Sequence, residues 1–161
     1  MPVLVYADRL HAGEEKTYRA LALSNLTAIY QKTPIGRLSA FCGAVSAGAG
    51  AGAGIAYLKG GDFEAVCRTV SNTLAVTPGM ICDGAKESCG LKVSNAASEA
   101  WSAAMLALEN RGIRNTQGII SPDIHELGIT LREFNEKIFS AADSVMIGLM
   151  TRQNRSAESR A

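Results

Sequence analysis

The sequence predicts an all-α fold, organised as a single compact helical domain around a central helix of small residues. Aromatic residues make up only 6% of the chain, whereas glycine occurs 16 times and alanine-rich stretches recur. This composition favours closely packed helices over a sandwich of β-branched strands. Hydrophobic residues account for 47% of the 161 residues and charged residues for 19%, which is enough to fill one core without disulfides. A chain of this length is expected to form one domain.

The first 61 residues are expected to contain two helices. Residues 14–31 carry apolar side chains at mostly helical spacing, the pattern of an amphipathic helix. Pro34 and Gly36 interrupt this pattern, and a second helix is expected to start just after them. Glycine and alanine alternate over residues 48–54, so glycines occupy more than one face and let neighbouring backbones approach closely. We therefore predict that this second helix is the central one.

Glycine, proline and aspartate mark the next boundaries. The glycines at residues 60–61 are expected to end the central helix, and Asp62 is expected to cap a helix that runs to about residue 74. A proline and a glycine at residues 78–79 interrupt the chain again. The segment CDGAKESC, residues 82–89, follows directly. This segment is therefore predicted to lie at a junction between two helices.

The last part of the chain is expected to hold two helical stretches and a tail. Helical periodicity resumes over residues 91–110 and returns over residues 123–150, with a break near Gly128. The loop-like stretch between them has room for a short extended piece. We assign residues 1–150 to one helical domain and expect the polar residues 151–161 to form a disordered tail.

Charge and targeting signals argue against several functional classes. Sixteen Lys and Arg stand against fifteen Asp and Glu, for a formal net charge of +1, so no overall field attracts nucleic acid or anionic lipid. The N-terminal apolar run is short and has no basic region before it, which argues against a signal peptide. We therefore expect a cytoplasmic protein without a nucleic-acid partner. In that compartment the four cysteines are expected to be thiols or metal ligands rather than disulfides.

The longest uncharged stretch, residues 38–58, is long enough to cross a bilayer as a helix. Most of its residues are alanine and glycine, which contribute little apolar area, so its insertion into a membrane is expected to be poor. We predict a buried helix here and no membrane partner.

Three cysteines are the candidate metal ligands. Cys82 and Cys89 flank a short glycine-bearing segment, and Cys42 opens the predicted central helix. In a straight helix the Cα atoms of Cys82 and Cys89 would lie about 10 Å apart, a stretched separation for one zinc ion. An iron–sulfur cluster is wider and can be held from several directions. Purely structural buried cysteines are the alternative, and Cys67 is predicted to be such a core thiol.

Three segments carry a resemblance to a known family. They are ALALSNLTAIYQK (residues 20–32), IGRLSAFCGAVSAGAGAGAGIAYLKGG (residues 35–61) and GMICDGAKESCGLKVSNAASEA (residues 79–100). These segments resemble the L-cysteine desulfidase family, which is related to the α-chain of iron–sulfur L-serine dehydratases. The similarity covers roughly residues 2–150, and the CDGAK block is its most specific part.

The resemblance implies an all-helical domain in which Cys42, Cys82 and Cys89 hold a 4Fe-4S cluster with one iron open to the substrate. It implies a β-elimination in which L-cysteine yields pyruvate, ammonia and sulfide, or L-serine yields pyruvate and ammonia. Members of the family have a large N-terminal portion before this region, which is expected to supply the base that abstracts the proton. A small amino-acid substrate and a separate or missing N-terminal portion are therefore the expected partners.

Several polar residues near these cysteines are candidates for contact with substrate. Lys86 and Lys92 could supply the positive charge that neutralises the substrate carboxylate, so that the α-proton becomes acidic enough to remove. Arg37 and Ser39 come just before the first cysteine, where one of them could recognise a carboxylate. For Arg37, helix capping or a surface ion pair is the alternative interpretation.

Asp83 and Gly84 follow the second cysteine directly. Asp83 either orients the loop and its ligand or is a solvated loop residue. Gly84 permits a backbone turn that a β-carbon would not allow, and could expose its N–H toward sulfide or carboxylate. The two histidines, His11 and His125, are interpreted as solvated or capping residues rather than as partners of a nucleophile.

Two other functions stay open on the sequence. The chain could be a helical assembly or regulatory protein that keeps the fold without catalysis, with homo-oligomerisation as its main property. It could also be a zinc-binding module. A brown colour after anaerobic purification would favour the cluster, whereas loss of a cluster in air would leave free thiols behind.

Overall fold

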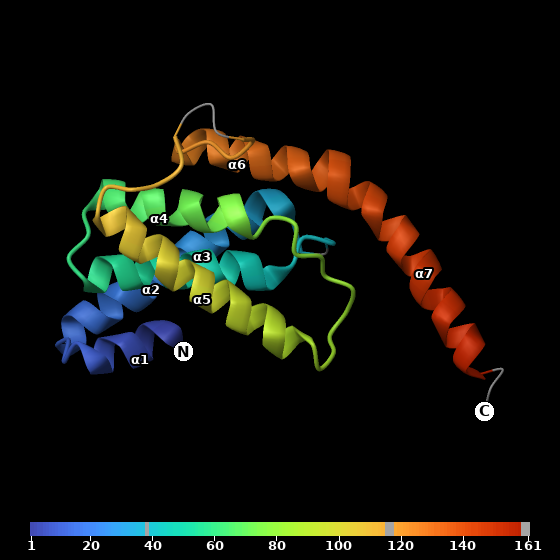
Figure 1. Ribbon diagram of the computed structural model, residues 1–161, viewed down its shortest axis with the longest axis horizontal. Coiled ribbons are helices and arrows are strands. Elements are labelled where there is room, and N and C mark those ends of the chain that lie inside the picture. Colours follow the sequence, from blue (N-terminus) through green and yellow to red (C-terminus); the bar gives the residue numbers. More distant parts are fainter. Residues whose placement is uncertain (38, 115–117, 159–161) are drawn as a thin grey trace.

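The computed structural model describes residues 1–37, 39–114 and 118–158, and this part of the chain is helical (Figure 1). The elements are α1 (Pro2–Arg9), α2 (Glu14–Ile35), α3 (Gly43–Leu58), α4 (Phe63–Val76), α5 (Cys89–Leu108), α6 (Ile124–Glu133), the π-helical segment η1 (Phe134–Phe139) and α7 (Ser140–Glu158). Within these residues, extended backbone pairs only at an isolated antiparallel bridge between Phe41 and Ile81. The all-α prediction is confirmed.

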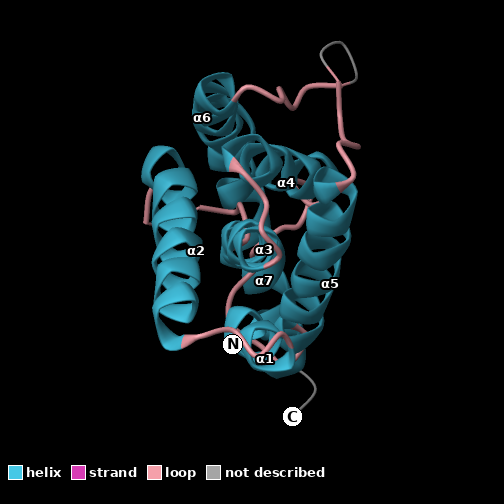
Figure 2. Cartoon of the chain, turned by 90° about the vertical axis from the view of Figure 1, so that its left-hand side faces the viewer, coloured by secondary structure: helices cyan, strands magenta, loops and turns pink. Residues whose placement is uncertain are grey.

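Helix α3 is the central helix, as predicted. Figure 2 shows it enclosed by α1, α2, α4 and α5, and twelve of its 16 residues are buried. Its glycines alternate between two neighbours. An added Cβ at Gly50 would lie 2.5 Å from the carbonyl oxygen of Ser24 in α2, and one at Gly48 would lie 2.8 Å from that of Ala96 in α5. The neighbouring backbones therefore approach so closely that no side chain fits at these positions.

The boundaries near α3 differ from those expected. Helix α2 continues through Pro34 and ends at Ile35, because a proline in the last turn removes only one backbone hydrogen bond. Gly36 then leaves the helix with φ +84°. Helix α3 begins at Gly43 rather than just after Gly36, since residues 40–42 are extended and pair with residues 80–82. Leu38, the first residue of the long uncharged stretch, lies outside the described residues.

Local signals placed α4 correctly. Asp62 is the N-cap residue, and its carboxylate accepts a hydrogen bond of 2.8 Å from the N–H of Ala65. Cys67 is buried on this helix, as predicted. In the part of the chain that the structure describes, no helix is both long enough and apolar enough to cross a membrane.

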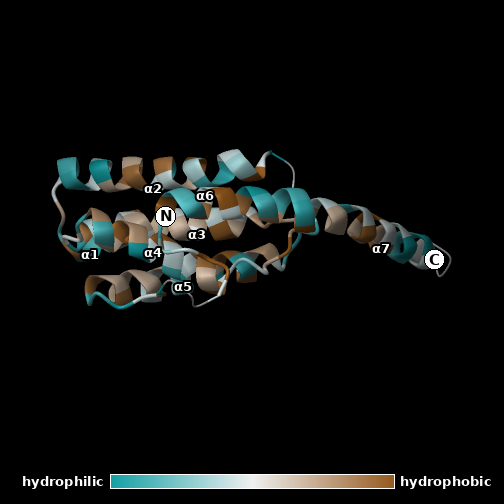
Figure 3. Cartoon of the chain, turned by 90° about the horizontal axis from the view of Figure 1, so that it is seen from above, coloured by the Kyte–Doolittle hydropathy of each residue, from teal (hydrophilic) through white to brown (hydrophobic). Residues whose placement is uncertain are grey.

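The C-terminal region forms one continuous helical stretch through α6, η1 and α7, without the break expected near Gly128. Gly128 lies inside α6, where an added Cβ would meet the hydroxyl oxygen of Tyr30 at 3.2 Å. Helix α7 extends beyond the other helices and presents both hydrophobic and hydrophilic residues (Figure 3).

The tail differs from the sequence-based expectation. A disordered segment was expected from residue 151, whereas α7 continues to Glu158. Arg155 lies in its last turn, where positive charge stabilises a helix through its dipole. Residues 159–161 of that tail, and residues 115–117 of the loop before α6, lie outside the described residues.

Candidate functional site

The isolated bridge brings two of the predicted cysteines to one place. The N–H of Cys42 donates to the carbonyl of Met80 at 3.1 Å, and the N–H of Cys82 donates to the carbonyl of Ala40 at 2.6 Å. Successive side chains of extended backbone point to opposite faces, so Cys42 and Cys82 share the face opposite to the Phe41–Ile81 pair. Diagonal neighbours of this kind have a separation of about 7–8 Å. The fold therefore places these two cysteines side by side although 40 positions separate them in the chain.

The segment before Cys42 is held by two interactions. The hydroxyl of Ser39 accepts a hydrogen bond of 3.0 Å from the N–H of Phe41, which fixes the backbone at the entry to the bridge. The ring of Phe41 is buried and packs edge-on against Phe139 of η1, with ring centroids 5.3 Å apart. Ser39 therefore positions the backbone next to the cysteine, and the contact of Phe41 with η1 could not be predicted from the sequence.

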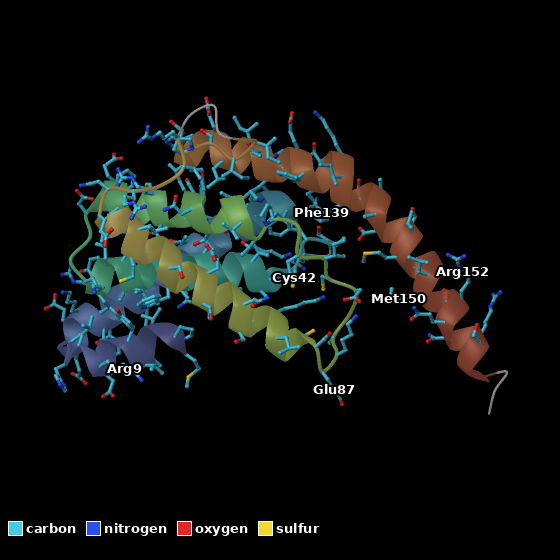
Figure 4. The ribbon with its side chains drawn as sticks, in the orientation of Figure 1. Arg9, Cys42, Glu87, Phe139, Met150 and Arg152 are labelled. Carbon is cyan, nitrogen blue, oxygen red and sulfur yellow. The ribbon has the colours of Figure 1, made fainter. Side chains whose placement is uncertain are left out.

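The N-termini of α3 and α5 lie at two of the candidate cysteines. Cys42 is the N-cap residue of α3, and Cys89 is the first residue of α5. Neither helix has a side-chain cap or an acidic residue in its first turn, whereas α4 and α6 are capped by aspartates. Two of the candidate cysteines therefore lie at the N-terminal ends of helices that have no side-chain cap. Figure 4 shows Cys42 at the end of α3 near the loop that carries Glu87.

Cys89 is engaged within its own loop. Its thiol lies 3.7 Å from the carbonyl of Gly84, to which it donates, and its sulfur accepts from the N–H of Lys86 at 3.4 Å. Gly84 has φ +94°, a conformation that favours glycine. In the described residues, no three His, Cys, Asp or Glu side chains stand close enough to hold one metal ion.

The two candidate lysines share one carboxylate. The ammonium of Lys92 donates to Oδ1 of Asp83 at 2.9 Å and to the carbonyl of Ile81 at 2.6 Å. The ammonium of Lys86 pairs with the other oxygen of Asp83. Asp83 therefore orients the loop, and both lysines hold the segment that contains Cys82.

The other polar residues singled out in the sequence lie apart from this network. Arg37 is exposed in the loop that leads from α2 toward the bridge. His11 lies at the turn between α1 and α2, and His125 lies in the first turn of α6. The structure therefore does not bring either histidine to the cysteines.

Sequence reasoning missed a cavity next to the loop. Its volume is about 500 Å³, and Ile81, Asp83 and Lys92 line one side while Met146, Leu149 and Met150 of α7 line the other. The three α7 residues are spaced i, i+3 and i+4, which places them on a single helix face. This spacing is the feature of the sequence from which an apolar wall could have been predicted. Helix α7 therefore supplies an apolar wall beside the lysine–aspartate pair.

Cys42, Cys82 and Cys89 are free thiols that a metal centre here could use. Thiolates are the protein ligands of iron–sulfur clusters, and the bridge already presents Cys42 and Cys82 on one face. Cys89 would have to release its contacts with Gly84 and Lys86 to join them.

Comparison with known proteins identifies the family of this chain. The family model described as serine dehydratase alpha chain matches residues 1–142. A UPF0597 protein of Lachnoclostridium phytofermentans is 44% identical over 150 residues, which make up 93% of this chain and 36% of that protein. A UPF0597 protein of Treponema denticola is 48% identical over 126 residues, 78% of this chain and 29% of that protein. No solved structure matches.

The chain thus spans about a third of the length of the curated relatives it matches. The family match covers most of the chain, including all three candidate cysteines. The chain belongs to the serine dehydratase alpha chain family.

Proposed function

We propose that the chain is the cluster-binding domain of an iron–sulfur-dependent β-eliminating lyase that acts on L-serine or L-cysteine. The observation that carries the proposal is the bridge between residues 40–42 and 80–82, which sets Cys42 and Cys82 on one face. Membership of the serine dehydratase alpha chain family supports the reaction class. Conversion of serine would yield pyruvate and ammonia, and conversion of cysteine would yield pyruvate, ammonia and sulfide.

Cys42, Cys82 and Cys89 are the proposed ligands of a 4Fe-4S cluster. When bound, the cluster would supply an iron with an open position that acts as a Lewis acid toward the β-hydroxyl or β-thiol of the substrate. The protein holds Cys42 at the start of α3, while Cys89, the first residue of α5, is bonded to the preceding loop, which contains the positive-φ Gly84. The first ligand is therefore fixed by the core, and the third would be brought in by rearrangement of the loop.

The charged residues of the loop are proposed to prepare the site rather than to carry the proton. Lys92 ties Asp83 and the carbonyl of Ile81 to α5, which fixes the backbone on both sides of Cys82. Lys86 adds positive charge at the same carboxylate. Arg37, exposed beside the entry to the bridge, is a proposed contact for the substrate carboxylate.

The base that removes the α-proton is proposed to come from outside this region. The relatives are almost three times as long as the part they share with this chain, so their remaining length can contribute to the site. We accordingly propose that a further polypeptide portion completes the active centre, in a cytoplasmic homo-oligomer.

Anaerobic reconstitution with iron and sulfide tests the cluster. The protein is expected to turn brown, with sulfur-to-iron charge-transfer absorption and matching amounts of iron and acid-labile sulfide. Cys42→Ser and Cys82→Ser are expected to abolish most of this absorption. Cys67→Ala is the matched control, since Cys67 is a buried thiol on α4, and it should retain the colour. A colourless wild-type protein would contradict the proposal, and zinc without acid-labile sulfide would identify a zinc module instead.

A non-catalytic assembly protein is the second candidate function. It is favoured by one observation, namely that large hydrophobic side chains of α2, such as Leu26 and Ile29, are exposed. Pyruvate release from serine or cysteine, measured with and without a chain that supplies the remaining portion, separates the two functions. Turnover in either mixture rules out a purely structural role.

A further inference from the structure

The outer face of α2 is apolar and exposed. Tyr18, Leu26, Ile29 and Tyr30 are large hydrophobic residues on its surface, with Leu26 63% and Ile29 59% exposed. Residues 20–31 contain no Asp, Glu, Lys or Arg, although the outward face of a surface helix normally carries charged and polar side chains. An apolar face of this kind is typical of a surface that binds another protein.

The exposed residues form one stripe along the helix. Ala22, Leu26, Ile29 and Thr33 are all exposed, and they follow one another at spacings of four, three and four residues, as in the seam of a coiled coil. The buried residues of α2 lie on the other side of the helix: Ala20, Gln31 and Ile35. We call the four exposed residues the α2 seam.

The α2 seam faces away from the proposed cluster site. Gly50 of α3 packs on α2 and Gly48 packs on α5, and two positions along a helix correspond to a rotation of about 200°, so α2 and α5 lie on opposite sides of α3. Figure 2 shows this arrangement, with no further helix of the described residues beyond α2. The loop of residues 82–89 is attached to α5 through Lys92. A portion that completes the active centre would therefore approach from the side of α5, which leaves the α2 seam for a different partner.

The charges at the two ends of α2 fit a second copy in the antiparallel direction. The start of the helix carries two acidic and two basic residues, whereas its end carries only basic ones: Glu14, Glu15, Lys16 and Arg19 at the start, and Lys32 and Arg37 at the end. A parallel pair of copies would place the two basic ends side by side, where they repel each other. An antiparallel pair places each basic end beside two carboxylates and also opposes the two helix dipoles.

We propose that the α2 seam is a two-fold symmetric interface between two copies of this chain, with their α2 helices antiparallel and overlapping over their full length. In this register Leu26 of each copy packs over Ala22 of the other, where the small side chain leaves room for it, and Glu15 lies beside Lys32. Two-fold pairs are the commonest homo-oligomers and bring the same patch of both copies together. The inference rests on the proposed function only for the homo-oligomer, and it requires neither the cluster nor the reaction.

Sedimentation equilibrium tests the interface. The wild type is expected to reach about twice the chain mass of 16.9 kDa and to dissociate on dilution, because one helix face lies at or below the lower end of the range of about 1,200–2,000 Å² that stable complexes bury. Leu26→Glu and Ile29→Glu each place a charge in the α2 seam, and both are expected to be monomeric at concentrations at which the wild type is a dimer. Ile147→Glu in α7 is the matched control, since Ile147 is 60% exposed, and it should stay dimeric. Circular dichroism confirms that each variant is folded.

Carbodiimide cross-linking tests the orientation. This reagent joins a carboxylate directly to an ammonium group, so the two groups must be in contact. Within one helix Glu15 and Lys32 lie about 25 Å apart along the axis, so a bond between them can form only between two copies. We expect this cross-link in a mixture of isotope-labelled and unlabelled protein, where mass spectrometry detects it as a peptide pair of mixed labelling.

The outcomes separate this inference from the proposed function. A monomeric wild type overturns the inference, as do Leu26→Glu and Ile29→Glu variants that stay dimeric or an Ile147→Glu variant that dissociates. A dimer without the cross-link between Glu15 and Lys32 overturns the antiparallel arrangement. A dimer that stays colourless after reconstitution with iron and sulfide overturns only the proposed lyase, whereas a brown monomer overturns only this inference.

Discussion

The ammonium of Lys92 lies 2.9 Å from a carboxylate oxygen of Asp83 and 2.6 Å from the carbonyl oxygen of Ile81. One side chain on the first turns of α5 thereby holds the residue before Cys82 and the residue after it. Because Ile81 also pairs with Phe41 across the bridge, the contact connects α5 to the start of α3. Lys92 thus attaches the loop that bears Cys82, the second proposed ligand, to α5.

Replacement of Lys92 by methionine should loosen this loop. A hydrogen bond to a charged group contributes about 1.5–3 kcal/mol when buried. Lys92 is 22% exposed and Asp83 38% exposed, so we expect a loss of about 1 kcal/mol in the free energy of unfolding after solvent screening. Urea titration measures the loss, and iron uptake should fall with it. Lys137→Met removes an exposed ion pair with Glu133 and should cost at most about 0.5 kcal/mol. Equal losses of unfolding free energy in the two variants would contradict a role of Lys92 in holding this loop.

The glycines of α3 and α7 should respond to alanine with opposite signs. At Gly50 an added Cβ would meet the carbonyl of Ser24 at 2.5 Å, so Gly50→Ala should destabilise the protein by about 1–3 kcal/mol. Gly148 in α7 has no neighbouring atom within 4 Å of that position. Gly148→Ala should therefore strengthen α7 by up to about 1 kcal/mol. Urea unfolding measures the first change and amide hydrogen exchange in α7 the second. Stabilisation by Gly50→Ala would refute the close approach.

Those features of the fold that depend on near neighbours in the chain could be predicted. The alternation of glycine and alanine indicated a helix with close contacts on two faces, and the packing of α3 against α2 and α5 follows that pattern. Asp62 caps α4 as its position before an amphipathic stretch indicated. Both signals are local, because helix caps and helix faces are set by residues within a few positions.

The bridge and the long C-terminal helix could not be predicted in the same way. Only three residues on each side form the Phe41–Ile81 pairing, too few for the alternation that marks a strand. The interaction of Lys92 with Asp83 depends on that pairing, since it fixes where the loop lies relative to α5. The roles of Cys42, Cys82 and Cys89 as ligands stay a prediction.

Cys67 should make the stability of the protein fall at alkaline pH. Burial raises the pKa of its thiol, and the carboxylates of Glu64 and Asp123 raise it further, against an opposing effect of Arg68. Because the folded protein holds this proton more tightly than the unfolded chain, the contribution is complete below the usual thiol pKa of about 8.5. It is lost as the pH rises through the raised value.

Urea unfolding of wild type and Cys67→Ala at pH 8 and pH 10 measures this contribution. The wild type should lose more stability than the variant between these two values, because other groups titrate equally in both proteins. Alkylation at pH 8 offers a second readout, in which Cys67 should react more slowly than the partly exposed Cys82 and Cys89. Identical pH profiles for the two proteins would show that burial of Cys67 has no such effect.

Asp123 should make the start of α6 sensitive to acid. Its carboxylate accepts hydrogen bonds from the N–H groups of Glu126 and His125, at 3.2 and 2.7 Å, and these bonds lower the pKa of the carboxyl. A lowered pKa in the folded state means that the contribution is present above the usual aspartate pKa of about 3.9. It is lost as the pH falls through the lowered value.

Amide exchange in α6 should therefore accelerate between pH 5 and pH 2 by more than the intrinsic pH dependence of exchange. Asp123→Asn keeps an oxygen acceptor at the N-cap but removes the titration, so its α6 should lose protection less steeply over the same range. Asp8→Asn in α1 is the control for the loss of one negative charge, and it should leave the α6 profile unchanged. If Asp123→Asn and wild type lost protection in parallel, acid sensitivity of α6 would arise from a group other than its cap.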